Sequence, residues 1–592
     1  EQAELSCLFA YAACIIDCSA ELSSQLKPEK PVLPEQLVPK PAPDYPELPL
    51  NVPGGENGFG RFLEDGYQII LQNNNTPAPW VNVCANPEFG FVVSERGSMY
   101  TYFYNSREFK ITPWNNDFVS DSGGEFLVIR DNETGKLNSI TKYPISDDGL
   151  YAAEHKFGYS EFTHHFDGLE GKMTVFADVE LPVKYTVITL INRMDFDRQI
   201  SLISYIEPVL SWIGRPGLVQ AEHNEDVVVL SNKFRAKWKD RQIFAALPEN
   251  TTFTTKKSEF FDQFGQMSLQ QKYFSDSAGT ASCLAMMTDC VIPAGETAEL
   301  TFIMGAYTKD TAAKQKQFDV HAELERVKQF WNSIFKIKVH SPDRTLDTFV
   351  NQWLLYQTIS CRLFARSAFY QSGGAFGFRD QLQDVLALLQ VKPELARNQI
   401  LLHSRHQFLE GDVQHWWHPD GQDTNSGVRT RFSDDLLWLV YVTSCYVETT
   451  EDFSILEETT PYIEDEPLPQ GEDERYRIPK VSSVSESIYQ HCIRAAERAL
   501  HFGEHGLLLM GSGDWNDGMN TVGNQGKGES VWLTFFMIEI LNKFIPICEH
   551  CKDSVRAEQY KEIRSKLIQA ADENAWDGNW YRRAYFDDGM PL

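Results

Sequence analysis

A change in hydrophobic periodicity near Lys309 constrains the fold of this 592-residue chain more than any other feature. Before this point, over residues 57–308, apolar and polar residues alternate in short runs that are separated by Gly, Pro, Asn and Asp. Residues 173–181 are an example, because Val175 and Asp178 would face opposite sides of a strand. Many short alternating runs with no helices between them predict a large antiparallel β-sandwich over residues 57–308.

After Lys309 the apolar residues recur at helical spacing instead. We interpret residues 309–340 as a helical linker. Ser341-Pro342-Asp343 then predicts a helix start, because Ser caps helices and Pro and Asp favour the first turn. Helices in series with long polar loops, and no strands between them, favour a helical barrel or toroid over residues 341–592, so the fold class is multidomain β + α. Further helices are expected over residues 380–390, 393–408, 434–446, 486–502 and 529–544.

Residues 1–56 differ from both regions. Their first part has the apolar spacing of a helix, and the Pro-rich stretch over residues 27–53 forbids helix and sheet interior. We interpret residues 1–56 as an N-terminal helical segment and a linker. The chain begins with Glu1 rather than Met, shows no signal peptide, and ends at Leu592 in a sequence typical of a turn, so we expect a fragment of a longer protein.

Charge and cysteine content exclude several function classes. The 54 Lys and Arg against 83 Asp and Glu give a formal net charge of −29, which repels nucleic acid and anionic lipid surfaces. The longest apolar runs, such as residues 7–16, are shorter than the roughly 20 residues of a membrane span, so we expect a soluble protein without direct membrane insertion. The 11 scattered cysteines suit reduced thiols in the cytoplasm.

Three segments beside the predicted helices carry residue types that suit chemistry on sugars. Loops at one rim of a helical barrel converge on a central pocket, so we expect these segments to share a site. A carboxylic acid that a neighbouring Trp partly desolvates can protonate a glycosidic oxygen, and Arg, Asn, Gln and His can hydrogen-bond sugar hydroxyls. The residues concerned are Arg379, Asp380, Gln383 and Asp384; His415, Trp416 and Trp417; and Asp514, Trp515, Asn516 and Asp517.

The aspartates around Trp515 also have plainer interpretations. Asp514 and Asp517 are ordinary turn residues that can cap helices. The spacing from Asp514 to Asn516 fits a calcium loop only weakly, because Gly518 comes one position early and no suitable Glu follows.

The second segment leaves similar alternatives. Adjacent Trp residues often pack with one in the core and one at a rim. His415 and His418 have a metal-compatible spacing, but no nearby Cys supports it, and we expect no metal site. Asp434 and Asp435 are interpreted as caps of the next helix.

At these residues the sequence resembles the inverting phosphorylases of glycoside hydrolase family ninety-four, which include cellobiose and chitobiose phosphorylases. The motifs are Phe378-Arg-Asp-Gln-Leu-Gln-Asp384, Gly411-Asp-Val-Gln-His-Trp-Trp-His-Pro419 and Gly513-Asp-Trp-Asn-Asp-Gly-Met-Asn520. Residues 74–82 and 105–117 favour the subgroup of β-1,2-oligoglucan phosphorylases and of the phosphorylase-like region of cyclic β-1,2-glucan synthases. The resemblance implies a β-sandwich, a helical linker and an (α/α)6 barrel, incomplete here at the C terminus.

The resemblance also implies the chemistry: inverting phosphorolysis of β-1,2-linked glucan to α-glucose 1-phosphate. Asp517 would be the general acid, Trp515 would line the sugar subsite, and Arg379 and Asp384 would hold the sugar at the non-reducing end. Inorganic phosphate would be nucleophile and co-substrate, so no cofactor is expected. The family's phosphate-binding residues would lie beyond Leu592.

The expected partners are therefore a β-glucan oligosaccharide and inorganic phosphate. The chain would act as a homodimer or as part of a larger synthase polypeptide. Its expected location is the cytoplasm, including the cytoplasmic part of an inner-membrane protein.

Two other functions remain open. An inverting β-glucan hydrolase would need a second carboxylate about 6.5–9.5 Å from the acid, and Asp384, Asp412 and Glu529 are candidates. A non-catalytic glucan-binding module would instead serve a glycosyltransferase elsewhere in the polypeptide. Phosphate dependence and product release distinguish the three functions.

Overall fold

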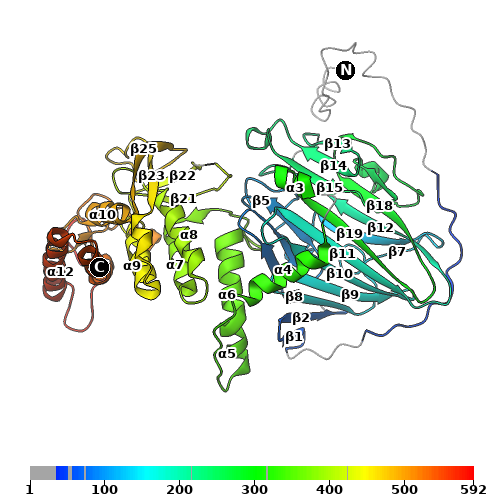
Figure 1. Cartoon of the computed structure of the whole chain (residues 1–592), viewed down its shortest axis with the longest axis horizontal. Coiled ribbons are helices and arrows are strands. Elements are labelled where there is room, and N and C mark those ends of the chain that lie inside the picture. Colours follow the sequence, from blue (N-terminus) through cyan, green and yellow to red (C-terminus); the bar gives the residue numbers. More distant parts are fainter. Residues whose placement is uncertain (1–34, 51–56, 73–74, 215–216, 315–317, 423) are drawn as a thin grey trace, which may run out of the picture. The chain divides into compact units, whose positions relative to one another are not determined.

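The structure is a computed structural model that describes residues 35–50, 57–72, 75–214, 217–314, 318–422 and 424–592 (Figure 1). The helix expected near the N terminus lies outside the described residues. The chain divides into two compact units, which are described separately. The first holds residues up to Ser333 together with Ser341–Phe349 and Ile359–Gly374, and the second holds Ile334–His340, Val350–Thr358 and Ala375–Leu592.

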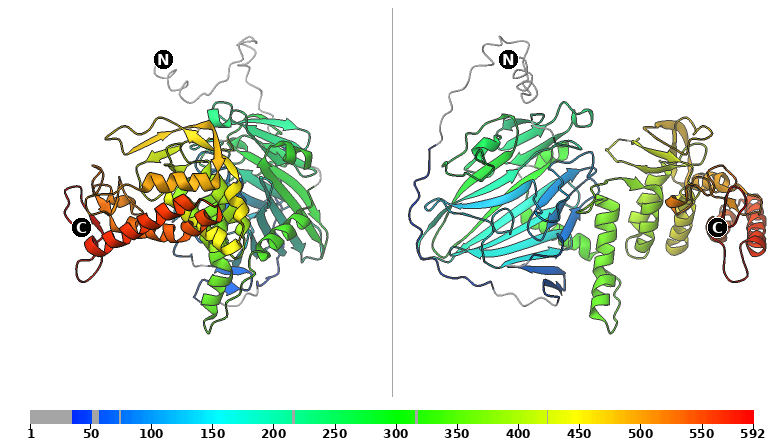
Figure 2. Two further views of the ribbon diagram at one scale, coloured as in Figure 1. Left: turned by 60° about the vertical axis from the view of Figure 1, so that its left-hand side comes forward. Right: turned by 180° about the vertical axis from the view of Figure 1, so that it is seen from behind.

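The first unit is an antiparallel β-sandwich, which confirms the prediction for this region (Figures 1 and 2). One sheet has 11 strands, in the order β1 (Gly60–Leu63), β2 (Gly66–Leu71), β8 (Tyr151–Lys156), β9 (Tyr159–Phe166), β10 (Leu169–Ala177), β11 (Val183–Asn192), β19 (Thr297–Ala306), β15 (Gln242–Ala246), β14 (Val227–Ser231), β13 (Gln220–Asn224) and β17 (Gly279–Thr280). The other has eight, in the order β16 (Thr251–Thr254), β18 (Leu284–Ile292), β12 (Arg198–Ile206), β6 (Glu125–Asp131), β5 (Met99–Phe103), β4 (Phe89–Ser94) and β3 (Val81–Ala85), with β7 (Leu137–Asn138) paired to β6.

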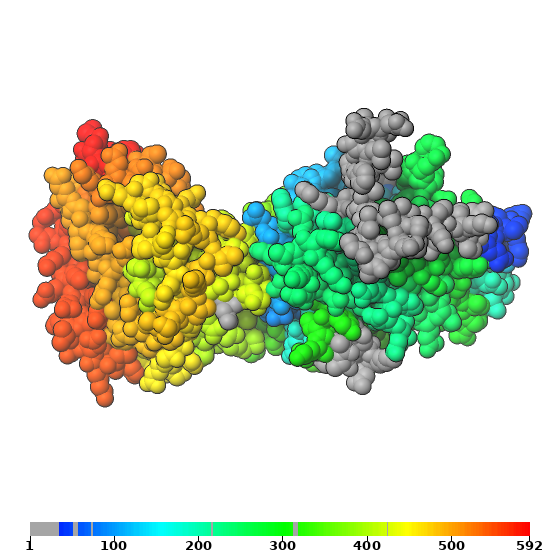
Figure 3. Space-filling view, turned by 90° about the horizontal axis from the view of Figure 1, so that it is seen from above, coloured from blue at the N-terminus to red at the C-terminus, as the bar shows by residue number. Residues whose placement is uncertain are grey.

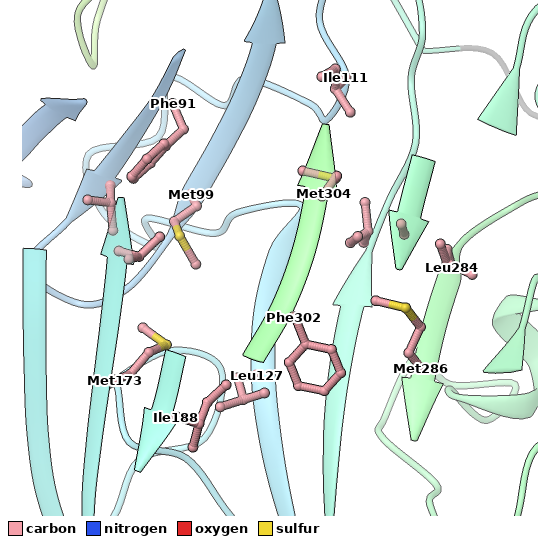
Figure 4. Packing of buried hydrophobic residues seen from close by; sticks show 14 of the residues in the cluster. Phe91, Met99, Ile111, Leu127, Met173, Ile188, Leu284, Met286, Phe302 and Met304 are labelled. Carbon is pink, nitrogen blue, oxygen red and sulfur yellow. The ribbon is translucent and has the colours of Figure 1, made fainter. Parts of the chain in front are cut away.

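Side chains from both sheets form the core of the sandwich. Figure 4 shows Met99 and Met286 of one sheet packed with Met173, Phe302 and Met304 of the other, all of them buried. Methionine is flexible enough to fill irregular gaps between two twisted sheets. The alternation that predicted β10 is confirmed, but the strand ends at Ala177.

Asp178 explains why β10 ends before Leu181. Its Oδ1 accepts the backbone N–H groups of Glu180 at 2.8 Å and Leu181 at 2.9 Å, which closes a turn.

One buried ion pair crosses the sandwich. Lys184 of β11 binds Glu125 of β6 and donates to the hydroxyl of Thr101 at 3.0 Å. Both charged groups are nearly inaccessible to water, and pairing them offsets the cost of burying each charge.

Helices follow the sandwich, as expected. The first unit contains α3 (Lys309–Lys314) and α4 (Val320–Asn332). Residues 344–365 combine α5 (Arg344–Thr348) and α6 (Leu354–Gln357) with the π-helical segments Phe349–Trp353 and Thr358–Ala365. The second unit contains α7 (Phe378–Val385), α8 (Pro393–Ser404), α9 (Leu437–Thr450), α10 (Ile488–Ala499), α11 (Val531–His550) and α12 (Ser554–Asn574).

The start of α5 differs from the prediction. Asp343 rather than Ser341 is the cap, because its carboxylate accepts the N–H groups of Thr345 and Leu346. A capping side chain reaches the free N–H groups two and three positions after it. Pro342 therefore precedes the cap instead of opening the helix.

Helix α9 is the centre of the second unit. It contacts α7, α8, α10 and α11, and ten of its side chains are buried. Its sequence is apolar all round, which is typical of a helix surrounded by others. Helices α11 and α12 lie side by side at the red end of the chain (Figure 2).

The expectation of no strands between these helices is wrong. Small sheets form from β20 (Phe376–Gly377), β21 (Gln414–Trp417), β22 (Gly427–Thr430) and β24 (Glu474–Arg477); from β23 (Thr459–Glu464) and β25 (Lys480–Ser487); and from β26 (Leu508–Leu509), β27 (Glu529–Ser530) and β28 (Ala584–Tyr585). The sheet of β23 and β25 carries two exposed valines, Val481 and Val484. Figure 3 shows this part of the chain in yellow and orange. Seven of these nine strands have only two to four residues, which is too short to show a period in the sequence, and the eight residues of β25 are mostly polar and exposed.

Among the described residues, α11 is the one helix long and apolar enough to cross a membrane, by length and composition only. Its 20 residues reach the length of a membrane span, so the expectation that every apolar run is shorter is wrong. Of its most apolar window, 56% is buried inside the structure, as in the core helix of a folded domain.

Candidate active site

The two aspartates beside Trp515 have opposite environments. Asp514 is fully buried, and its carboxylate accepts Nη2 of Arg583 at 2.6 Å and the hydroxyl of Ser530 at 2.5 Å. Burial alone would raise the pKa of Asp514, but these donors hold it below its usual value. Asp514 is therefore an ionised anchor that a sugar does not reach.

Asp517, by contrast, is open to solvent, with its side chain 48% exposed. It begins the short 3₁₀ turn Asp517–Met519, and Asn516 caps this turn by accepting the N–H of Gly518 at 3.0 Å. The Oδ1 of Asp517 accepts Nη2 of Arg379 at 2.7 Å. Of the two aspartates, Asp517 is thus the one placed to meet a substrate.

Arg379 reaches Asp517 from the first turn of α7. Its other terminal nitrogen donates to both carboxylate oxygens of Asp434, at 3.1 and 3.2 Å, and lies 3.9 Å from Asp435. Burial would lower the pKa of Arg379, but the charges of Asp434, Asp435 and Asp517 raise it. The guanidinium is therefore a fixed cation that orients Asp517.

Asp434 and Asp435 are both fully buried at the start of α9. Asp434 also accepts the indole N–H of Trp438 at 3.0 Å, while Oδ1 of Asp435 has no hydrogen-bond partner among the described residues. Burial and the charge of Asp435 raise the pKa of Asp434 to about 7, against the opposing effects of Arg379 and Trp438. The prediction that these residues cap α9 is wrong, because that helix has no side-chain cap.

His415 completes the cluster from β21. Its Nδ1 lies 2.8 Å from Oδ2 of Asp435, and its Nε2 lies 3.8 Å from Oδ2 of Asp517. Burial alone would lower the pKa of His415, but the charges of Asp435 and Asp517 raise it above its usual value. The aromatic ring of Phe432 packs beside the imidazole, with centroids 4.7 Å apart.

Trp515 and Gln383 form the apolar edge of the site. The indole N–H of Trp515 donates to Oε1 of Gln383 at 3.2 Å, and Trp515 remains 51% exposed. An exposed indole whose edge is fixed in this way suits stacking against a sugar ring. Gln383 follows Arg379 by one helical turn, so one face of α7 supplies both residues.

Other predicted site residues lie elsewhere. Trp417 is fully buried and stacks on His406 with centroids 3.7 Å apart, while Trp416 faces the other way and packs beside Tyr476. Asp380 folds back on the start of α7, where a Cβ on Gly377 would collide with its carboxylate.

Asp384 is half-buried one turn after Asp380 on the same helix. The structure thus gathers Arg379, Gln383, His415, Trp515 and Asp517, while Asp514 and Asn516 fix the loop that carries Asp517.

The carboxylates considered for a hydrolase base have other partners. Both oxygens of Asp412 accept from Arg429 at 2.7 Å, and Glu529 is buried against Nδ1 of His505 at 2.5 Å. Among the described residues, no group of three or more His, Cys, Asp or Glu is placed to hold a metal ion.

Sequence reasoning missed the roles of Asp434, Asp435 and Arg583. The signal available was two acidic residues directly before the apolar helix α9, because acids at that position become buried when the helix does. Arg583 lies 69 residues beyond Asp514, and no local pattern connects the two.

Comparisons with known proteins identify the domains of the chain and its fold. Residues 330–592 match the profile described as the glycosyl hydrolase 94 superfamily, catalytic domain, and residues 65–323 match the glycosyl hydrolase 94 supersandwich domain. A bacterial glucoamylase complexed with acarbose shares the fold at a TM-score of 0.50, with 11% identity over 88% of this chain and 73% of that one.

The similar curated proteins are enzymes of sugar polymers and disaccharides. The chain is 37% identical over 561 residues to the cyclic beta-(1,2)-glucan synthase NdvB of Rhizobium meliloti. This alignment covers 90% of this chain but only 20% of the relative. It is 25% identical over 582 residues to N,N'-diacetylchitobiose phosphorylase of Vibrio furnissii, covering 90% of this chain and 70% of the relative. Solabiose phosphorylase of Paenibacillus borealis is 26% identical over 571 residues, with 90% and 69% covered.

Two profiles that together match most of the chain, and relatives that align over nine-tenths of it, place this protein in the glycosyl hydrolase 94 family.

Proposed function

We propose that this chain supplies the acid-bearing part of an inverting glycoside phosphorylase acting on β-1,2-linked glucan, with α-glucose 1-phosphate as the product. The observation that carries the proposal is Asp517, half-exposed between Arg379 and His415 and two residues from the exposed Trp515. A carboxyl group in this position can protonate a glycosidic oxygen whose sugar stacks on the indole.

In the proposed reaction, Asp517 gives its proton to the leaving oxygen as the glycosidic carbon–oxygen bond breaks. An oxygen of phosphate forms the new bond to the anomeric carbon from the opposite face, which inverts the configuration. Phosphate replaces the water that a hydrolase activates, so no second carboxylate base is required. The ion pairs of Asp412 and Glu529 argue against either of these two residues as a base.

The phosphate site requires cations that are not already neutralised. Arg379 is bound by Asp434 and Asp517, and Arg583 by Asp514. We therefore propose that residues beyond Leu592 in a longer protein bind phosphate and complete an (α/α)6 barrel.

The choice of β-1,2-linked glucan rests on the relative named as a cyclic beta-(1,2)-glucan synthase, while the phosphorylase relatives act on other disaccharides by name. The proposed setting is the cytoplasm, as a homodimer or within a synthase polypeptide. Eight cysteines in the described residues are free thiols, which suits a reducing compartment.

The test is the release of glucose 1-phosphate from β-1,2-glucooligosaccharides by the full-length protein, with and without inorganic phosphate. Phosphate-dependent release is expected, and Asp517→Asn should abolish it while the protein still melts normally and binds glucan. Free glucose released without phosphate would identify a hydrolase instead. Glucan binding without any product would identify a non-catalytic module, and normal turnover by Asp517→Asn would remove Asp517 from the acid role.

A further inference from the structure

Asp517 faces a second titratable group, His415, which the proposed reaction does not use. Among the described residues, three charged groups surround this imidazole: Asp435 just before α9, Asp517 at the start of its own turn, and Arg379 of α7. A fourth neighbour, Phe432, is apolar. His415 therefore lies between two carboxylates, with a guanidinium as the third charged group.

The contact with Asp435 decides which ring nitrogen faces the acid. A carboxylate can only accept, so Nδ1 of His415 donates to Oδ2 of Asp435 over 2.8 Å. This leaves Nε2 directed toward Oδ2 of Asp517, 3.8 Å away. A carboxylate that fixes one nitrogen of a histidine, so that the other can move a proton, is a recurrent arrangement in acid–base catalysis.

We propose that His415, oriented by Asp435, returns a proton to Asp517 after each glycosidic bond is broken. The inference rests on the proposed function and names His415 as a proton-transfer residue and Asp435 as its positioning residue. The separation of 3.8 Å is bridged by a small side-chain rotation or by one water molecule, since catalytic hydrogen bonds are commonly long in the absence of substrate.

The proton balance of the cycle closes. Asp517 gives its proton to the leaving sugar oxygen and becomes a carboxylate. His415 then transfers the proton on Nε2 to Oδ2 of Asp517 and becomes neutral, while its Nδ1 proton stays on the bond to Asp435. The phosphate ester, formed from hydrogen phosphate, releases its proton to water, and His415 takes one proton back from water.

The transfer leaves the net charge of the cluster unchanged. It neutralises the carboxylate of Asp517 and the imidazolium of His415 together, so no new charge is created beside the buried Asp435. Arg379 cannot take this role, because a guanidinium is not deprotonated in proteins.

Exposure agrees with the same assignment. The side chain of His415 is 16% exposed and that of Asp517 is 48% exposed, so water reaches the cluster on one side. Asp435 is closed off at 2% side-chain exposure, which protects the contact that fixes the tautomer.

The test compares His415→Gln with the wild type in the full-length protein, using two β-glucosides that differ in leaving group. A sugar leaving group needs protonation, whereas a nitrophenolate leaves without it. His415→Gln should lower kcat for the oligosaccharide about tenfold to hundredfold, with little change in KM and an earlier loss of activity at high pH. The same variant should keep nearly full activity on the nitrophenyl substrate.

Asp435→Asn should show the same selectivity to a smaller degree, because it leaves His415 present but unoriented. His501→Gln, at an exposed histidine, is the matched control and should change neither substrate. Equal loss of activity on both substrates, with an unchanged pH profile, would reduce His415 to a structural role and overturn the relay. Absence of phosphorolysis by the wild type would instead overturn the proposed function on which the relay rests.

Discussion

Asp514 and Asp517 are three positions apart, yet the fold gives them different physical roles. Asp514 is enclosed with Arg583 and Ser530 and fixes the loop, while Asp517 projects into solvent beside an arginine that three carboxylates hold. Residue type and spacing left both aspartates open as the acid. Burial is the property that separates them, and it depends on Arg583, which is distant in the sequence.

This difference predicts that two asparagine variants change the free energy of unfolding by different amounts. Asp514→Asn should lower the free energy of unfolding by about 2–3 kcal/mol, because it leaves Arg583 without its counter-ion in a partly buried place. Asp517→Asn should change it by less than about 1 kcal/mol, because the side chain is half-exposed and Arg379 keeps Asp434. Denaturant unfolding of both variants measures the effect. A larger loss for Asp517→Asn than for Asp514→Asn would contradict the assignment.

At the scale of elements, short segments position the site. Arg379 and Gln383 come from one face of α7, His415 from the four-residue strand β21, and the buried acids from the residues before α9. The long elements were predictable, because the alternation in β10, the amphipathic spacing of α10 and the apolar run of α9 extend over enough residues to be recognised.

Strand β21 and the roles of Asp434 and Asp435 could not be predicted from the sequence, for physical reasons. The strand β21 was interpreted as part of a loop, because four residues show no period. Asp434 and Asp435 resembled helix caps, because acids before a helix usually contact its free N–H groups. They instead bind Arg379 and His415, and this follows only from the burial of α9 among four other helices.

Strand β21 also predicts unequal effects of its two tryptophans. Trp417→Ala should lower the free energy of unfolding by about 3–5 kcal/mol, because it removes a fully buried side chain that packs on His406. Trp416→Ala should lower it by much less, because this side chain is only partly buried. Thermal or denaturant unfolding tests this pair. A stable Trp417→Ala variant with weakened glucan binding would place Trp417 in the substrate site after all.

At the scale of the whole molecule, the two units carry different sets of buried titratable groups. In the second unit burial lowers the pKa of His403 and His491 to about 4 and that of His406 to about 3. Since histidine titrates near 6.5 when unfolded, acidification from pH 6 to 5 loads protons on the unfolded unit alone and lowers its stability. Asp434 offsets the effect of one of these three histidines, because its raised pKa lets the folded unit bind a proton that the unfolded unit does not bind.

The sandwich is more nearly balanced. Burial lowers the pKa of His155 to about 4 and also lowers that of His164, so both lose stabilisation as the pH falls. Burial raises the pKa of Glu95 to about 7 and that of Asp121 to about 6, so these carboxyls are protonated in the folded state before the unfolded state. Their contribution grows as the pH falls, which opposes the histidines.

Acidification from pH 6 to pH 5 should therefore weaken the helical unit first. After the offset by Asp434, two histidines remain, and each lowers the free energy of unfolding by about 1.4 kcal/mol per pH unit. The helical unit should therefore lose up to roughly 3 kcal/mol, against about 1 kcal/mol or less for the sandwich. Hydrogen exchange, corrected for the intrinsic pH dependence of amide exchange, measures this in the amides of α9 and β10. In His491→Gln, the loss of stability on acidification should be smaller by one histidine's contribution in the amides of α9. It should be unchanged in those of β10. Equal loss of protection in both units would show that the buried histidines do not govern acid stability.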